Sequence, residues 1–221
     1  MIIALEELKR FPVSHGISDR RISHADFMKR LGLPDGVSVA RLEQVHAGKV
    51  VKIDTDSNLL NEIAGADAAI TGTKGIVLSV RTADCLPVLF YDPEHNAIGI
   101  AHAGWKGTKD MICRNVVAAM GSEYKSVPAN ILVGMGPALR QCCYEVNSEF
   151  LVHFPDSVVK MAHRHYFDMV GENARQLIAS GVSAKNIFDC GICTACSNDE
   201  FYSFRKEKDK AGRMLSVVML K

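Results

Sequence analysis

The feature that most constrains the fold is a series of short apolar runs spread along the whole chain. The runs are VSVARL, GADAAITG, GIVLSV, CLPVLFY, AIGIAHAG, NILVGMG and MLSVVML. Most are rich in Val and Ile and are bounded by Gly, Asp, Asn or Pro, a pattern typical of β-strands. No run approaches the roughly 20 apolar residues that a membrane-spanning helix needs. We therefore predict a core built from β-sheet and no membrane as a partner.

Three longer segments have the apolar spacing of amphipathic helices. They are SHADFMKRLGL with Ser23 as the N-cap, KDMICRNVVAAMGSEY, and the segment from Asp168 to Ser180 that Gly181 ends. Strands and helices do not alternate regularly along the chain. The pattern predicts an α+β fold rather than a doubly wound parallel sheet.

Length and charge narrow the organisation and the partners. The 221 residues fit one large domain, so we interpret residues 1–221 as a single catalytic domain. A formal net charge of +1 gives no electrostatic argument for nucleic acid. The start, MIIALEELKRFP, lacks the pattern of a signal peptide, and with 7 cysteines we expect reduced thiols or metal ligands. These features predict a cytoplasmic protein and leave its oligomeric state open.

One stretch, RTADCLPVLFYDPEHNAIGIAHAGW, reads as two strands joined by a turn. If the loop is Asp92 to His95, Tyr91 faces Asn96 and Cys85 falls opposite His102. Opposed residues in an antiparallel pair share a face, with Cβ atoms roughly 4.5–5.5 Å apart, which suits two ligands of one metal ion. A change of one residue in the loop would turn the two side chains apart.

His46, in RLEQVHAGKV, is a candidate third ligand. Two His and one Cys can hold a catalytic zinc and leave a fourth position for water or substrate. The same residues are open to other interpretations. His46 fits a satisfied histidine on an apolar strand, and Cys85 with His102 fits a thiol nucleophile and its base.

Five motifs occur in order along the chain: QVHAG, TADCLPVLFYD, HAGWKGT, GMGPALRQCCYEV and FYSFRKEKDKAGR. Together they resemble the YfiH-type laccase-domain family, long labelled polyphenol oxidases. Its members are regarded as purine nucleoside phosphorylases with accompanying adenosine deaminase activity. The resemblance runs from about Phe11 to the C-terminus. ADC followed by HAGW is its most specific part.

The resemblance implies a zinc held by His46, Cys85 and His102. It implies purine nucleosides such as adenosine, inosine or methylthioadenosine as substrates, with phosphate as co-substrate. The fold it implies is a mixed β-sandwich-like core flanked by helices, similar to the cytotoxic necrotizing factor catalytic domain.

Further residues are candidates for the same site. Cys85, His102 and Asp84 are the candidate catalytic residues, with Asp84 expected to point to the opposite strand face and to support the site. Gly104 and Gly107 are expected to form an anion-approaching loop around Trp105. The candidate substrate-binding residues are Arg41, Gln44, Trp105, Lys106 and Arg205. Gln44 is expected on the strand face of His46, Trp105 against a purine, and Lys106 and Arg205 near phosphate.

The chain departs from the family pattern in three places. QVHAG stands where QVHG is usual, Lys106 stands where Arg is usual, and the segment DRRISHADFMKRLGL is shorter than its family counterpart. A lysine holds phosphate as a point charge, whereas an arginine offers two parallel donors. These departures bear on the substrate range.

The remaining cysteines and the histidine count bear on competing interpretations. Cys190, Cys193 and Cys196 have the spacing of a metal knuckle but lack a fourth ligand in sequence, so buried thiols are the favoured interpretation. A copper-dependent, laccase-like phenol oxidase is an alternative function. The chain has 8 His in total, fewer than a full multicopper cluster requires. A cysteine hydrolase using Cys85 and His102 would fit the same residues. A zinc-stabilised scaffold without activity would need a closed four-ligand site, and because only three ligands are identifiable, an open site is favoured.

Overall fold

The computed structural model describes residues 2–53 and 63–221, and within these residues the strands form three sheets. The largest has six strands in the order β13 (Ile187–Asp189), β9 (Leu132–Met135), β7 (Leu86–Asp92), β8 (Ala97–Ala103), β5 (Ala68–Thr71) and β4 (Val50–Lys52). The second has five strands in the order β1 (Ile2–Ile3), β2 (Val13–Ser18), β14 (Met214–Leu220), β6 (Ile76–Thr82) and β3 (Ser38–Arg41). Both sheets mix parallel and antiparallel pairs.

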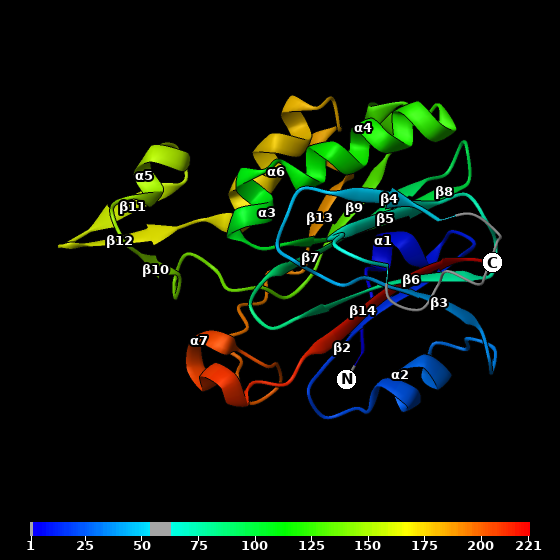
Figure 1. The fold of residues 1–221 in the computed structure, drawn as a ribbon, viewed down its shortest axis with the longest axis horizontal. Coiled ribbons are helices and arrows are strands. Elements are labelled where there is room, and N and C mark those ends of the chain that lie inside the picture. The colour runs from blue at the N-terminus through cyan, green and yellow to red at the C-terminus, as the bar shows by residue number, and fades with distance from the viewer. Residues whose placement is uncertain (1, 54–62) are drawn as a thin grey trace.

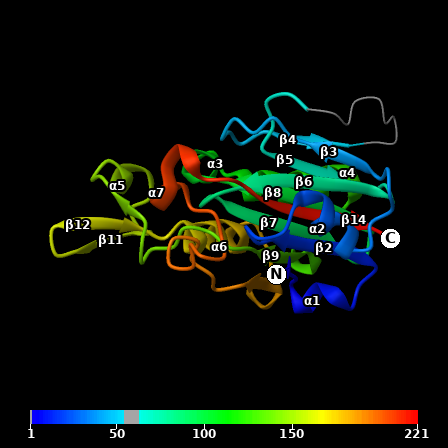
Figure 2. The same ribbon diagram turned by 90° about the horizontal axis from the view of Figure 1, so that it is seen from below.

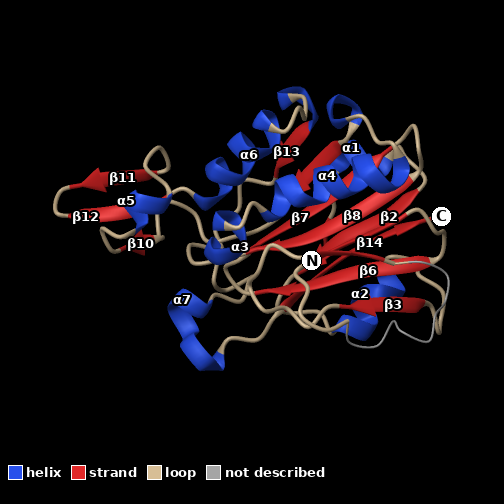
Figure 3. Ribbon diagram, turned by 45° about the horizontal axis from the view of Figure 1, so that its top comes forward, coloured by secondary structure: helices blue, strands red, loops and turns tan. Residues whose placement is uncertain are grey.

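The two large sheets face each other across an apolar layer (Figures 1 and 3). Ile17, Leu78 and Val218 of the five-stranded sheet share one buried cluster with Leu89 and Ile100 of the six-stranded sheet. Alternate residues of a strand point to opposite faces, so the neighbours of these residues serve the outer faces. The core is therefore a sandwich of two sheets.

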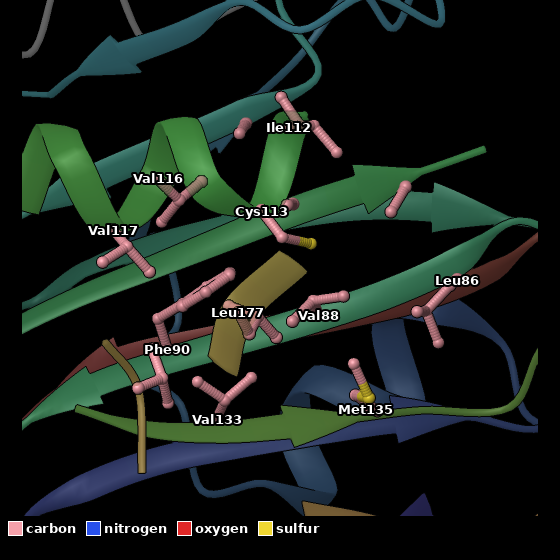
Figure 4. Packing of buried hydrophobic residues seen from close by; sticks show 14 of the residues in the cluster. Leu86, Val88, Phe90, Ile112, Cys113, Val116, Val117, Val133, Met135 and Leu177 are labelled. Atoms are coloured by element: carbon pink, nitrogen blue, oxygen red, sulfur yellow. The ribbon is translucent and has the colours of Figure 1, made fainter. Parts of the chain in front are cut away.

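Helices cover both outer faces. The helices are α1 (Glu6–Lys9), α2 (His24–Arg30), α3 (Trp105–Lys109), α4 (Ile112–Tyr124), α5 (Phe150–His153), α6 (Met169–Ala179) and α7 (Phe204–Glu207). Figure 4 shows Val116 and Val117 of α4, with Leu177 of α6, packed on Val88 and Phe90 of β7. On the other side α2 lies beside the five-stranded sheet (Figure 2), and Phe27 of α2 shares a buried cluster with Val77 and Val217 of that sheet. The α+β interpretation is confirmed.

A small arm stands away from the sandwich in Figures 1 to 3. Its three-stranded sheet has the order β10 (Glu145–Val146), β12 (Arg164–Phe167) and β11 (Val158–Met161), and α5 lies beside it. Aromatic rings join the arm to the main body: Phe150 lies 5.2 Å from the ring of Trp105, and Phe154 stacks on Phe167 at 4.4 Å. The contact between Phe150 and Trp105 holds the base of the arm against α3.

All seven predicted strand runs contain a strand, and the three predicted helices are α2, α4 and α6. Ser23 caps α2 by accepting a hydrogen bond from the backbone N–H of Asp26, and Gly181 follows α6 with a left-handed φ of 93°. The expected loop around Trp105 was wrong, because Gly104 is the N-cap of the short helix α3. No described helix has both the length and the apolar character required to cross a membrane. The likeness to the cytotoxic necrotizing factor domain stays a prediction.

The predicted hairpin forms, with a register two residues away from the expected one. Tyr91 pairs with Ile98 and Pro87 with His102, so Cys85 is not opposite His102 and lies just before β7. Asp92 causes the shift, because its carboxylate accepts hydrogen bonds from the backbone N–H groups of Glu94 and His95. These bonds start the turn after Asp92 and keep Asp92 in the strand. A shift of two residues preserves the strand face.

Candidate metal centre

Three side chains meet where the two sheets reach α3 and α7. His46, Cys85 and His102 each offer one ligand atom, and these atoms lie within 4.8 Å of one another. The two imidazole rings meet edge to face, with centroids 4.7 Å apart. His102 is buried, Cys85 is half-buried and His46 is exposed. The metal-ligating trio predicted from the sequence is therefore brought together in space.

Each ligand has its own structural support. His102 is the penultimate residue of β8, and its backbone N–H bonds to the carbonyl oxygen of Asp67 at 2.7 Å. Cys85 directly precedes β7. His46 lies in a loop with a left-handed φ of 62°, so its expected place on a strand was wrong. The three ligands come from a strand end, a strand start and a strained loop.

Asp67 organises the centre, and its role was not predicted from the sequence. Its fully buried carboxylate accepts hydrogen bonds from the backbone N–H groups of Val45, His46 and Ala47. The same carboxylate accepts a hydrogen bond from Nδ1 of His102 at 2.7 Å. This bond leaves Nε2 of His102 for a ligand, as carboxylates do for histidines in zinc sites. The signal in the sequence was an aspartate at the head of an apolar strand, in GADAAI.

The centre favours a thiolate beside imidazoles. Burial alone would raise the pKa of the Cys85 thiol, but hydrogen bonds and charge from His102 and His46 lower that pKa to about 6. Burial would lower the pKa of His102, but hydrogen bonds with Asp67 and Cys85 raise it to about 9. A thiolate and two neutral imidazoles form a donor set that suits zinc, and a binding zinc ion would displace the second ring proton of His102. The residues present therefore fit a bound metal ion.

A cavity of about 830 Å³ opens over the three ligands. Its lining contains three arginines, Arg81, Arg205 and Arg213, and three aromatic side chains, Trp105, Tyr144 and Phe204. Asp84 and Glu43 are the acidic residues of the same lining. A metal centre at the base of a cavity with cations and rings on its walls is suited to an anionic co-substrate and a planar group.

The family model described as a multi-copper polyphenol oxidoreductase laccase matches residues 20–221. The chain belongs to this family. The resemblance inferred from the five motifs is thereby confirmed.

Two curated relatives and one solved structure describe what this laccase-domain protein is similar to. It is 34% identical over 186 residues to a purine nucleoside phosphorylase of Clostridium acetobutylicum, a match that covers 83% of this chain and 77% of the relative. It is 30% identical over 223 residues to adenosine deaminase RL5 of an unknown prokaryotic organism, covering 93% of this chain and 85% of the relative.

The solved structure is the hypothetical protein YfiH of Bacillus licheniformis. The TM-score is 0.92 at 23% identity, and the match covers 100% of this chain and 96% of that structure. At this identity the likeness shows the fold alone.

Three predicted substrate residues of the laccase-domain protein line the cavity, and two of them, Trp105 and Arg205, come from α3 and α7. Trp105 begins α3, and the ring of Phe150 contacts it from the arm. Arg205 lies in α7, where its guanidinium stands 5.4 Å from the ring centre of Tyr144 and its Nη1 donates to the carbonyl oxygen of Glu145. Both side chains are half-buried.

Asp84 holds one side of this wall together. With a left-handed φ of 85°, it leaves the strand alternation expected from the sequence. Its carboxylate accepts hydrogen bonds from Thr194 Oγ1 and from the backbone N–H of Arg205, both at 2.6 Å. Asp84 therefore supports the cavity by fixing the start of α7.

Gln44 is in the lining of the cavity but not on a strand, so its expected strand position was wrong. Its side-chain amide donates to the carbonyl oxygen of Arg81 and accepts from the backbone N–H of Arg81, both at 2.8 Å. Gln44 thus uses its polar atoms to hold Arg81.

Two predicted residues of the laccase-domain protein are not brought into this cavity. Arg41, at the end of β3, lines a neighbouring cavity of about 730 Å³. Lys106 is exposed on α3, with Nζ 5.7 Å from the ring centre of Trp105. Sequence reasoning missed Arg81, Arg213 and Tyr144. Tyr144 and Arg213 lie inside quoted motifs and Arg81 directly precedes another, but the motifs do not show which of their residues face the cavity.

Proposed function

We propose that residues 1–221 form one catalytic domain that acts as a zinc-dependent purine nucleoside phosphorylase with adenosine deaminase activity. The observation that carries the proposal is the convergence of His46, Cys85 and His102 at the base of a cavity with arginines and aromatic rings on its walls. Curated relatives named purine nucleoside phosphorylase and adenosine deaminase support the same reaction classes.

His46, Cys85 and His102 would hold the zinc ion. A bound zinc supplies a Lewis acid, which polarises an oxygen atom of water or substrate. Copper is the alternative that the family description suggests. Blue-copper sites commonly add a long axial Met or Gln to His₂Cys. The described lining of this cavity includes no Met, and the side-chain amide of Gln44 is bonded to Arg81. The donor set therefore favours zinc.

Phosphorolysis breaks the C1′–N9 bond of the nucleoside and joins phosphate to C1′. The cavity must hold an anion close to the sugar while the bond breaks. Arg81, Arg205 and Arg213 provide the positive charge for this task. A guanidinium grips phosphate through two parallel donors, which also orient it. We assign phosphate binding to these arginines, with Arg205 as the residue already predicted from the sequence.

The departing purine needs a flat apolar contact. Trp105 and Tyr144 expose rings to the same cavity. Rings stack on purines with offset geometry, and a nearby cation strengthens the contact. We assign binding of the purine base to these two rings. Gln44 was expected to contact the edge of the base, but its side chain bonds to Arg81 instead.

The experiment combines metal analysis with turnover. Purified protein is assayed for zinc and copper, and adenosine and inosine are then incubated with it in the presence and absence of phosphate. The proposal expects zinc in the protein, free base only with phosphate, and ammonia from adenosine. Metal-replete protein that releases neither base nor ammonia would contradict it. Phenol oxidation that requires added copper would favour the laccase-like alternative.

One observation favours a second candidate, a cysteine hydrolase with Cys85 as nucleophile. The lowered pKa of Cys85 and its hydrogen bond with His102 are what a thiol nucleophile and its base require. The two candidates differ in their response to metal. A hydrolase gains activity when a chelator frees the thiolate, whereas the proposed phosphorylase loses activity.

A further inference from the structure

A second group of sulfur atoms lies outside the three-ligand centre. Cys142 and Cys143 come from the turn after β9, and Cys193 and Cys196 come from the turn after β13. All four Sγ atoms lie within 4.8 Å of one another. Sγ of Cys196 is 3.7 Å from that of Cys142 and 3.4 Å from that of Cys143. Residues about 50 positions apart thus bring two cysteine pairs together.

These distances match a single tetrahedral ion. Zinc binds cysteine sulfur at about 2.3 Å, and a tetrahedron of that size sets its sulfurs about 3.8 Å apart. A polynuclear iron–sulfur cluster places its cysteines on different irons and needs them further apart. All seven cysteines of the chain are described, and all are free thiols. The geometry is therefore that of a mononuclear four-sulfur site.

Backbone contacts prepare the second pair for an ion. The backbone N–H groups of Arg140 and Cys196 donate hydrogen bonds to the sulfur of Cys193. Cys193-Thr-Ala-Cys196 has the C-x2-C spacing of zinc ligands, and N–H groups aimed at the first sulfur stabilise its thiolate.

Without a cation, the sulfurs of the first pair, Cys142 and Cys143, lie too close to the other sulfurs for all four to be ionised. Cys142 and Cys143 are adjacent in the sequence, and the sulfur of Cys196 lies 3.7 Å from the first and 3.4 Å from the second. Crowded thiols keep their protons because negative charges at this distance repel. A divalent cation removes that repulsion, and the thiol protons pass to solvent as the sulfurs bind.

The two turns that carry the pairs are already joined by backbone bonds. The N–H of Ala138 donates to the carbonyl oxygen of Ile192, and the N–H of Thr194 donates to that of Ala138. Leu139 packs against Cys193 and Ala195 in the same small cluster. The four sulfurs are therefore held by a rigid frame.

From this geometry we infer that Cys142, Cys143, Cys193 and Cys196 bind one structural tetrahedral metal ion, zinc in the first place. The ion braces a wall of the cavity, because Tyr144 follows Cys143 and Thr194, which donates to Asp84, lies between Cys193 and Cys196. Four thiolates close the coordination sphere, so the site is structural. Iron fits the same four sulfurs, and the test separates the two metals.

The test counts metal ions by elemental analysis of protein purified under reducing conditions. Wild type is expected to hold two ions per chain. Cys196→Ser is expected to hold one, and so is His46→Ala, which removes the other centre. Cys190→Ser is the matched control, because Cys190 belongs to the same C-x2-C-x2-C run but not to the cluster, and it should keep both. Iron at the site would give a red protein, whereas zinc gives a colourless one.

Equal metal contents in wild type and Cys196→Ser would overturn the inference, and so would a Cys143–Cys196 disulfide found under reducing conditions. If Cys196→Ser is insoluble, Cys85→Ala is loaded with cobalt instead. Intense sulfur-to-cobalt absorption in that variant supports a four-sulfur site, and its absence rejects one. Because Cys85→Ala and His46→Ala disable only the first centre, failure of the proposed function and failure of this inference give different results.

Discussion

At the residue scale, Gly104 shows how little space surrounds the metal centre. A Cβ at this position would lie 2.9 Å from Sγ of Cys85 and 3.2 Å from Cδ2 of His46. Its φ is −79°, a value that any residue adopts. Glycine is needed at position 104 because a side chain would collide with Cys85 and His46, and not because of the backbone conformation.

We predict that Gly104→Ala weakens zinc binding by about 10–100-fold, the range seen when groups that orient metal ligands are changed. The added methyl group would push Cys85 and His46 apart. Competition with a chromophoric chelator measures the affinity. Gly107→Ala is the control in the same helix, because its Cβ would meet other atoms only at 3.4 Å or more. Equal affinities of the two variants would contradict the prediction.

At the element scale, the hairpin of β7 and β8 decides where Cys85 and His102 stand. Burial alone would raise the pKa of Asp92, but hydrogen bonds to its carboxylate outweigh burial and hold the pKa below its usual range. They come from the side chains of Ser126 and His95 and from the backbone N–H groups of the turn. The carboxylate therefore stabilises both the turn and the register.

We predict that Asp92→Ala lowers the free energy of unfolding by about 1–3 kcal/mol at pH 7, because buried N–H groups lose their acceptor. A carboxyl group with a lowered folded pKa stabilises the fold above its unfolded pKa of about 3.9. That contribution is lost as pH falls through the folded pKa. The difference from wild type should therefore shrink below about pH 4.

Urea unfolding at several pH values measures this difference. Glu94→Ala is the control, since it removes an exposed carboxylate from the same turn. A difference between Asp92→Ala and wild type that stays constant down to about pH 2 would reject the assigned role of the charge.

The elements themselves could be predicted from the sequence, because apolar runs and caps are local signals. The hairpin was predicted with the right partners, but its register depends on the side chain of Asp92, which apolar spacing does not report. The loop position of His46 escaped prediction for a similar reason. Its conformation is fixed by Asp67, a residue that lies 21 positions away.

At the scale of the whole molecule, the cavity is assembled from distant parts of the chain. Asp84 and Thr194 are 110 positions apart and share a hydrogen bond. Cys142 meets Cys196 across 54 positions. The spacing of residues along one sequence does not report contacts between residues that lie so far apart. The meeting of His46, Cys85 and His102 could be predicted because each is a chemically distinctive residue within a family motif. Arg81, Arg213 and Tyr144 lie within or beside such motifs too, but nothing local shows that they face one cavity.

A net charge of +1 gives the molecule little attraction for anions as a whole, so the proposed phosphate site depends on local arginines. We predict that Arg205→Gln raises the KM for phosphate at least about tenfold, because a charged hydrogen bond contributes about 1.5–3 kcal/mol. Arg164→Gln is the matched control. Arg164 also bonds to Glu145 but lies on the arm outside the cavity lining. Initial rates at varied phosphate concentration give the KM of each variant. Equal KM values for Arg205→Gln and Arg164→Gln would contradict the assignment.

Asp67 has one more consequence. Its carboxylate joins the loop of His46 to the strand of His102 through hydrogen bonds among protein groups alone. The ligands are thus set during folding, and metal uptake needs little further loss of conformational entropy. A chain made without metal should fold first and be loaded later. Since divalent ions compete for one donor set largely by their supply, the ion found in the protein will then reflect the cell or medium in which it was loaded.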